Sequence, residues 1–235
     1  MRTLFAILTG TLTATWLAIA GTATAQSTDI NAIAEMLAPL SPKEIQTALH
    51  APITDDQLPA GFSGASLIGQ AEAESQVAEV GATDSVTYSV LYMPGGEPTP
   101  GSQTPSRASG PARLYNTASI SYLIFDESLS QEDLAGFDDM LRTMVGDQAT
   151  GADVQEISVA GFPAYLISTE TETNGIPIVI DWVAVPVGKV VVIGMTMSGG
   201  ESVDQNALGE DANALSIAAI NHLQVSIEQR GTPAG

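Results

Sequence analysis

The sequence predicts an α/β (α+β) fold, a three-layer α/β/α sandwich with a mainly antiparallel sheet and a helix on each face. Short turns join most of the strand-like runs, and strands joined in this way pair antiparallel. The run from 178 to 197, IVIDWVAVPVGKVVVIGMTM, is apolar at both odd and even positions, so both faces of these strands must be covered. Two amphipathic segments, one before and one after this block, can each cover one face.

Residues 1–25 have the pattern of an export signal. A basic start, MR, precedes the uncharged apolar stretch LFAILTGTLTATWLAIA, and ATA then offers small residues at the cleavage positions, so we expect cleavage near Ala25. The alternative is an uncleaved anchor, but threonines dilute a stretch that needs about 20 strongly apolar residues to span a bilayer. We therefore expect a secreted, periplasmic or cell-envelope protein with no membrane span in the mature chain.

The composition excludes several classes of protein. There are 27 acidic and 7 basic side chains, and loss of Arg2 with the signal takes the formal charge from −20 to −21. Nucleic-acid binding needs basic patches, so it is excluded. The acids are spread along the chain, which favours a role in solubility, although attraction of cations or of a basic partner stays open. There is no cysteine, which excludes disulfides, thiolate metal sites and a lipid-modified Cys.

The first mature segment, 26–57, is expected to be a helical arm or a tether. Apolar residues recur at helical spacing in 27–40. The next helix should begin after Ser41, with Pro42 in the first turn and Glu44 completing a capping box. The sequence leaves open whether this arm is ordered.

The main domain is expected over 58–228, followed by a polar tail at 229–235. Residues 65–69 and 85–93 are strand-like, and 112–126 should pair with the second of these runs. Between them lies the Pro/Gly-rich segment 94–111, which we interpret as a hairpin insertion rather than a domain linker.

A helix is predicted over 128–146, capped by Ser130 and with acids in its first turn. Four strands follow, at 154–161, 164–172, 178–185 and 189–197. Asn174-Gly175 and Pro186-Val187-Gly188 should form two of their turns. An apolar stripe predicts a last helix over 204–227.

This order resembles the Mog1/PsbP-like fold, which includes exported proteins of the LpqN type. The resemblance covers 58–223 and rests on LPAGF, SYLIFD before the first helix, VAGFPAYLI, the hairpin-rich centre and the final helix. It implies an accessory, binding or assembly protein and carries no catalytic signature. The insertion at 94–111, the arm and the missing lipidation Cys depart from the pattern.

Residues for common catalytic chemistry are missing. Only His50 and His222 could act as an imidazole base, each near a helix end where a structural role is sufficient, and no G-x-S-x-G elbow is present. Two distant histidines do not predict a zinc site, and DQNALGED (204–211) matches a calcium loop poorly. We expect no catalytic residue, no metal site and no cofactor.

Asp181 is the one acid set among apolar neighbours in a strand. If it is buried, its pKa should be raised and it becomes a site candidate, with Trp182 and Tyr165 as further ligand-binding candidates. Alternatively, it faces water or an edge, or accepts a hydrogen bond from Tyr165, Thr169 or Lys189.

The sequence therefore favours an exported, non-catalytic binding or accessory protein whose partner, a protein or a small molecule, is not identified. One alternative is a secreted hydrolase that uses carboxylates alone, either Asp181 or the acids near the Pro/Gly-rich segment. Another alternative is a cation-binding structural domain.

Overall fold

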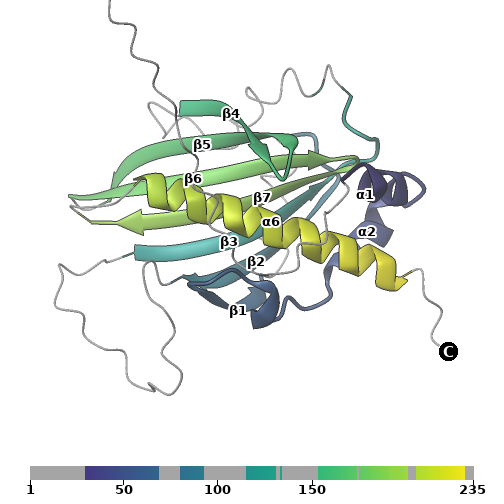
Figure 1. The fold of residues 1–235 in the computed structure, drawn as a ribbon, viewed down its shortest axis with the longest axis horizontal. Coiled ribbons are helices and arrows are strands. Elements are labelled where there is room, and N and C mark those ends of the chain that lie inside the picture. The colour runs from purple at the N-terminus through teal and green to yellow at the C-terminus, as the bar shows by residue number, and fades with distance from the viewer. Residues whose placement is uncertain are drawn as a thin grey trace, which may run out of the picture.

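The computed structural model describes residues 30–68, 80–92, 115–130, 133, 153–173, 175–200 and 205–230 (Figure 1). Its helices are α1 (Ile30–Leu37), α2 (Pro42–Leu49) and α6 (Gln205–Arg230), with a short 3-10 turn, η1, at Asp55–Gln57. Its strands are β1 (Phe62–Leu67), β2 (Asp84–Tyr92), β3 (Tyr115–Ile124), β4 (Asp153–Val159), β5 (Phe162–Thr173), β6 (Ile176–Val187) and β7 (Val190–Gly199). The insertion at 94–111 lies outside the described residues.

In the part of the chain that the structure describes, the strands form one seven-stranded sheet in the order β1-β2-β3-β7-β6-β5-β4, and every neighbouring pair is antiparallel. The antiparallel sheet is thus confirmed. The β4–β5 turn contains Ala160 and Gly161, both with positive φ, as a tight two-residue turn requires. Strand β6 continues through Pro186 and Val187, so the next turn lies at Gly188-Lys189, later than predicted.

Helix α6 lies on one face of the sheet, over β6 and β7 (Figure 1). It approaches closely because Gly194 of β7 has no side chain: a Cβ there would lie 2.5 Å from the Ala212 carbonyl oxygen. The Gly194 amide donates to Ser216 Oγ (3.0 Å), and Ser216 in turn donates to the Val183 carbonyl oxygen (2.8 Å). Helix and sheet are therefore joined by polar contacts as well as by apolar packing.

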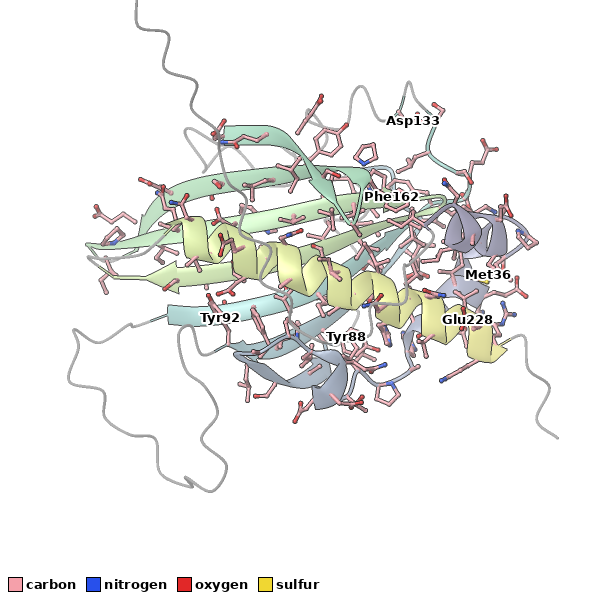
Figure 2. The ribbon with its side chains drawn as sticks, in the orientation of Figure 1. Met36, Tyr88, Tyr92, Asp133, Phe162 and Glu228 are labelled. Atoms are coloured by element: carbon pink, nitrogen blue, oxygen red, sulfur yellow. The ribbon has the colours of Figure 1, made fainter. Side chains whose placement is uncertain are left out.

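Helices α1 and α2 pack into the same core, near the C-terminal end of α6 (Figure 1). Ile33, Leu37 and Leu49 are fully buried there. Tyr88 and Tyr92 extend from β2 on this side of the sheet (Figure 2), and the Tyr88 hydroxyl donates to the Leu49 carbonyl oxygen (2.6 Å). The segment expected as an arm or a tether thus contributes ordered helices to the core.

The opposite face of the sheet has its own buried apolar cluster: Val80, Ala82, Leu123, Phe125, Ile167, Ala184, Val191 and Ile193. The helix predicted over 128–146 is described only at its start, where the Asp133 amide donates to Ser130 Oγ (3.1 Å) and the Ser130 amide to Asp133 Oδ2 (2.7 Å). The rest of it lies outside the described residues. A three-layer sandwich with a helix on each face is therefore not confirmed, since α1, α2 and α6 all pack on one face.

Candidate ligand-binding pocket

A pocket of about 730 Å³ opens between the first half of α6 and strands β4, β5 and β6. This volume falls within the roughly 300–1,000 Å³ range of small-molecule sites. The strands contribute Asp153, Gln155, Ile157, Leu166, Ser168, Glu170, Val179 and Asp181, and the helix contributes Gln205, Asn206, Gly209, Glu210 and Asn213. The apolar residues continue the core, and the polar ones surround them.

Asp181 is the buried acid of this pocket. Its neighbours in register are Ser168 on β5 and Thr196 on β7, and only 1% of the residue is exposed. It points toward α6 at Gly209, where an added Cβ would lie 3.8 Å from Asp181 Oδ2. Since Gly209 has no side chain, the carboxylate reaches the pocket rather than a helix side chain.

No described residue donates a hydrogen bond to either carboxylate oxygen of Asp181. The Thr196 hydroxyl donates instead to the Leu208 carbonyl oxygen (3.0 Å). Burial raises the pKa of Asp181, and Ser168 lowers that pKa by a smaller amount without reaching hydrogen-bonding geometry. Asn213 Oδ1 is a third buried acceptor without a donor among the described residues. Buried polar groups in folded proteins are nearly always paired, so three orphans in one pocket need an explanation.

The pocket carries negative charge. Asp153, Glu170 and Glu210 are exposed on its wall, and no Lys or Arg is among the described residues that line it. Gln205 Nε2 donates to Glu170 Oε1, which joins the start of α6 to β5. Two described basic groups have partners elsewhere: Lys189 donates to the Leu40 carbonyl oxygen, and Arg230 pairs with Glu44.

The structure separates Asp181 from the other two predicted ligand-binding residues. Tyr165 and Trp182 lie on the opposite face of the sheet, packed against the cluster that contains Ile167 and Val191. Their ligand-binding role stays a prediction, and it would require a different site. Of the three partners considered for Asp181, Thr169 shares the face of Tyr165, and Lys189 lies at the far end of the hairpin.

Sequence reasoning did not find the residues that surround Asp181. In β5, alternate positions are occupied by Leu166, Ser168 and Glu170, which therefore share one face of the sheet. This pattern indicates that the covered face becomes polar toward the end of the strand. Gly209 and Asn213 are one helical turn apart, which places them on the same face of α6. Nothing in either pattern says that these two faces meet.

His222 has a structural place. It is buried on α6; its Nε2 lies 2.9 Å from the Ala51 carbonyl oxygen and its Nδ1 lies 2.9 Å from the Tyr122 hydroxyl. A carbonyl only accepts, so Nε2 carries the proton, and in the neutral ring Nδ1 is an acceptor for the Tyr122 hydroxyl, which also lies 3.1 Å from the Ala219 carbonyl oxygen. Burial lowers the pKa of His222, which favours this neutral form. His50 is exposed at the C-cap of α2.

Among the described residues, no three His, Asp or Glu side chains are grouped so that they could hold a metal ion. Asp204, the first residue of the poor calcium-loop match, lies outside the described residues. In the part of the chain that the structure describes, no helix is both long and apolar enough to cross a membrane.

The fold and the pocket together define an α+β protein with a candidate ligand site under a sheet-covering helix. No model of a protein family matches the chain, and no curated protein matches it. Solved structures similar to it include LpqN, described as involved in cell envelope biogenesis of Mycobacterium tuberculosis (14% identity, 68% of this chain and 78% of that chain, TM-score 0.32). Another is the extracellular domain of PknH from the same organism (10%, 79% and 92%, TM-score 0.30).

A third is PA94 from Pseudomonas aeruginosa, described as a protein of unknown function (18% identity, 74% of this chain and 97% of that chain, TM-score 0.28). All three likenesses are weak and concern the fold alone. LpqN is among them, but membership of the Mog1/PsbP-like group stays a prediction.

Proposed function

We propose that this chain is an exported, non-catalytic binding protein whose small-molecule ligand occupies the pocket between α6 and β4–β6. The observation that carries the proposal is Asp181, a carboxylate buried at the pocket without a hydrogen-bond donor. Ionisable groups with strongly shifted pKa values occur more often in functional clefts than elsewhere in proteins. The unpaired charge of Asp181 does not stabilise the fold. A ligand with a complementary group would gain binding energy by pairing with it.

The ligand-binding role is tested by a thermal-shift screen of chemically diverse small molecules on the mature chain. A ligand that binds only the folded protein raises its melting temperature. We expect at least one class of compound to raise it, and substitution Gly209→Leu, which places a side chain in the pocket, to abolish the shift. Shifts that survive Gly209→Leu would contradict this pocket as the binding site.

Export rests on the sequence pattern of residues 1–25 alone. Its test is expression of the full chain in a bacterium, fractionation, and mass measurement of the protein. We expect a chain beginning at Gln26 outside the cytoplasm, in the periplasm, envelope or medium. A full-length chain that stays in the cytoplasm would contradict export and would leave the pocket proposal standing.

A second candidate function is hydrolysis by carboxylates. The favouring observation is that one buried acid with a raised pKa, Asp181, shares a pocket with three exposed acids, and some enzymes divide acid and base roles between two carboxylates in this way. A panel of glycosides and esters tests it on wild type and Asp181→Asn. Turnover that this substitution abolishes would overturn the non-catalytic proposal, and absence of turnover on the whole panel would remove the hydrolase.

A further inference from the structure

The three unpaired acceptors of the pocket indicate what the ligand must supply. Asp181 Oδ1, Asp181 Oδ2 and Asn213 Oδ1 are all buried, and each lacks a donor among the described residues. Gly209 faces Asp181 directly, and Asn213 is four residues further on the same side of α6, so the acceptors belong to one region of the pocket. A complementary ligand group must therefore be rich in hydrogen-bond donors.

We propose that the pocket binds a primary organic ammonium ion, with its N–H groups directed at Asp181 and Asn213. An ammonium group has three donors and no acceptor, which matches the three unpaired acceptor atoms Asp181 Oδ1, Asp181 Oδ2 and Asn213 Oδ1. Hydrogen bonds between an ammonium and a carboxylate are charge-assisted and stronger than neutral ones. This inference rests on the proposed binding function and names its ligand class.

The surrounding charge favours a cation over an anion or a neutral amide. Three further acids, Asp153, Glu170 and Glu210, line the pocket, and no basic residue is among its described lining residues. A cleft lined by one sign of charge concentrates ions of the opposite sign. Glu170 is held in place by Gln205, so this edge of the pocket is organised without a ligand.

The size and the apolar wall favour an organic cation over a bare metal ion. Ile157, Leu166 and Val179 present hydrocarbon to the pocket, and its volume of about 730 Å³ far exceeds the space a single ion fills. Small-molecule sites combine an apolar lining with a few oriented polar groups. A short alkyl chain attached to the ammonium would bury against these three residues.

The state of Asp181 agrees with this ligand class. Burial raises the pKa of Asp181 because the charged form has lost its water. A cation placed beside the carboxylate favours the charged form and offsets that loss. The same acid that destabilises the unliganded fold thus becomes a binding group when an ammonium is present.

The test is isothermal titration of the mature chain with n-butylammonium at neutral pH and 150 mM sodium chloride. Butanol and butyrate serve as neutral and anionic analogues of similar size, and calcium chloride as the inorganic cation. We expect n-butylammonium to bind while both analogues bind at least tenfold more weakly. Amide resonances of Gly209 and Asn213 should shift in NMR spectra during the titration.

Two pocket variants and one control decide whether binding occurs at this site. Asp181→Asn removes the charge with little change in shape, and Gly209→Leu fills the space beside it. Each should weaken n-butylammonium binding at least tenfold. Glu35→Gln removes one acid from the exposed face of α1 and should leave the affinity unchanged, which controls for unspecific attraction to an acidic protein. If Asp181→Asn fails to fold, Gly209→Leu carries the test.

Several outcomes would overturn the inference. Equal n-butylammonium binding by wild type and Asp181→Asn would do so, and so would a calcium response that needs Asp181 and exceeds the n-butylammonium response. Binding of neutral or anionic compounds that Gly209→Leu abolishes and Asp181→Asn leaves intact would refute the ammonium and support the pocket. Failure of every compound class to bind would refute both the ligand class and the proposed function.

Discussion

Asp181 is a charged residue on a strand whose other inward-facing residues include Val179, Val183 and Val185. Its pKa is raised, so as pH rises the unfolded chain releases this proton before the folded chain does. The contribution of Asp181 to stability therefore falls as pH increases from the ordinary pKa of 3.8 to the raised folded value. Above the folded pKa the loss is complete, and the folded chain then carries the full cost of a buried charge.

Asp181→Asn is consequently expected to stabilise the unliganded protein at neutral pH, by about 1–2 kcal/mol in free energy of unfolding. The gain over wild type should shrink toward pH 3, where the acid is neutral in both states. Urea unfolding between pH 3 and pH 8 measures it. Glu172→Gln, an exposed acid on β5, is the control and should change stability little. A loss of stability in Asp181→Asn at pH 7 would show that the fold does use this charge.

His222 gives the opposite pH dependence. Its pKa is lowered, so as pH falls below the ordinary value of 6.5 the unfolded chain binds a proton before the folded chain does. Its contribution to stability is thus present above pH 6.5 and is lost as pH falls toward the folded pKa. Only the neutral ring can accept the Tyr122 hydroxyl proton at Nδ1, whereas Nε2 donates to the Ala51 carbonyl oxygen in both protonation states.

His222→Gln should lower the free energy of unfolding at pH 8 by about 1–3 kcal/mol, the usual effect of disturbing buried hydrogen bonds. The gap from wild type should narrow as pH drops below 6.5. Melting temperatures across pH 5–8 measure this difference. His50→Gln, at an exposed helix end, is the control and should leave the free energy of unfolding nearly unchanged. A constant gap at all pH values would contradict a neutral His222.

At the scale of elements, the contact between β7 and α6 depends on one absent side chain. A Cβ at Gly194 would lie 2.5 Å from the Ala212 carbonyl oxygen and 2.7 Å from the Ser216 amide nitrogen, and helix backbone cannot yield as a flexible side chain does. Gly194→Ala should therefore lower the free energy of unfolding by about 1–3 kcal/mol or more, as overpacking of a tight core does.

Gly209→Ala is the matched control for that substitution, because it lies on α6 but meets nothing closer than 3.7 Å. Replacing a helical glycine by alanine there should raise stability by about 0.5–1 kcal/mol. Urea unfolding of the two variants side by side measures both effects. Equal effects of the two changes would mean that α6 does not approach β7 as closely as described.

The elements themselves were largely predictable, because hydrophobic period and turn residues are local signals. The expected strands 178–185 and 189–197 correspond to β6 and β7, and the final helix expected over 204–227 corresponds to α6 at Gln205–Arg230. The sequence predicts the turn after β6 too early, because proline usually ends a strand and position 186 is a proline. Here Pro186 pairs with Val191, and the chain turns only at Gly188, which lies against Ala34 of α1.

At the scale of the whole molecule, α1 and α2 share one core with the sheet. Leu37→Ala, in a fully buried position of α1, should lower the free energy of unfolding by about 2–5 kcal/mol. Unfolding should stay a single cooperative transition, because the helices and sheet unfold together. Circular dichroism with heating measures this, and Glu35→Ala on the exposed side of α1 is the control. An unchanged melting temperature in Leu37→Ala would mean that α1 is a detachable tether.

The order of the described strands and helices, their antiparallel pairing, the acidity and the isolated acid Asp181 all follow from the amino-acid sequence. Each of these follows from local patterns: the alternation of apolar residues, Gly and Asn at turns, and caps such as Ser130 with Asp133. Tertiary packing, in contrast, brings α1 and α2 into the core and turns Asp181 toward Gly209 and Asn213 rather than toward Trp182 and Tyr165. The pocket joins residues of β4–β6 with α6 residues distant along the chain, and which faces meet is set by the packing of the whole core.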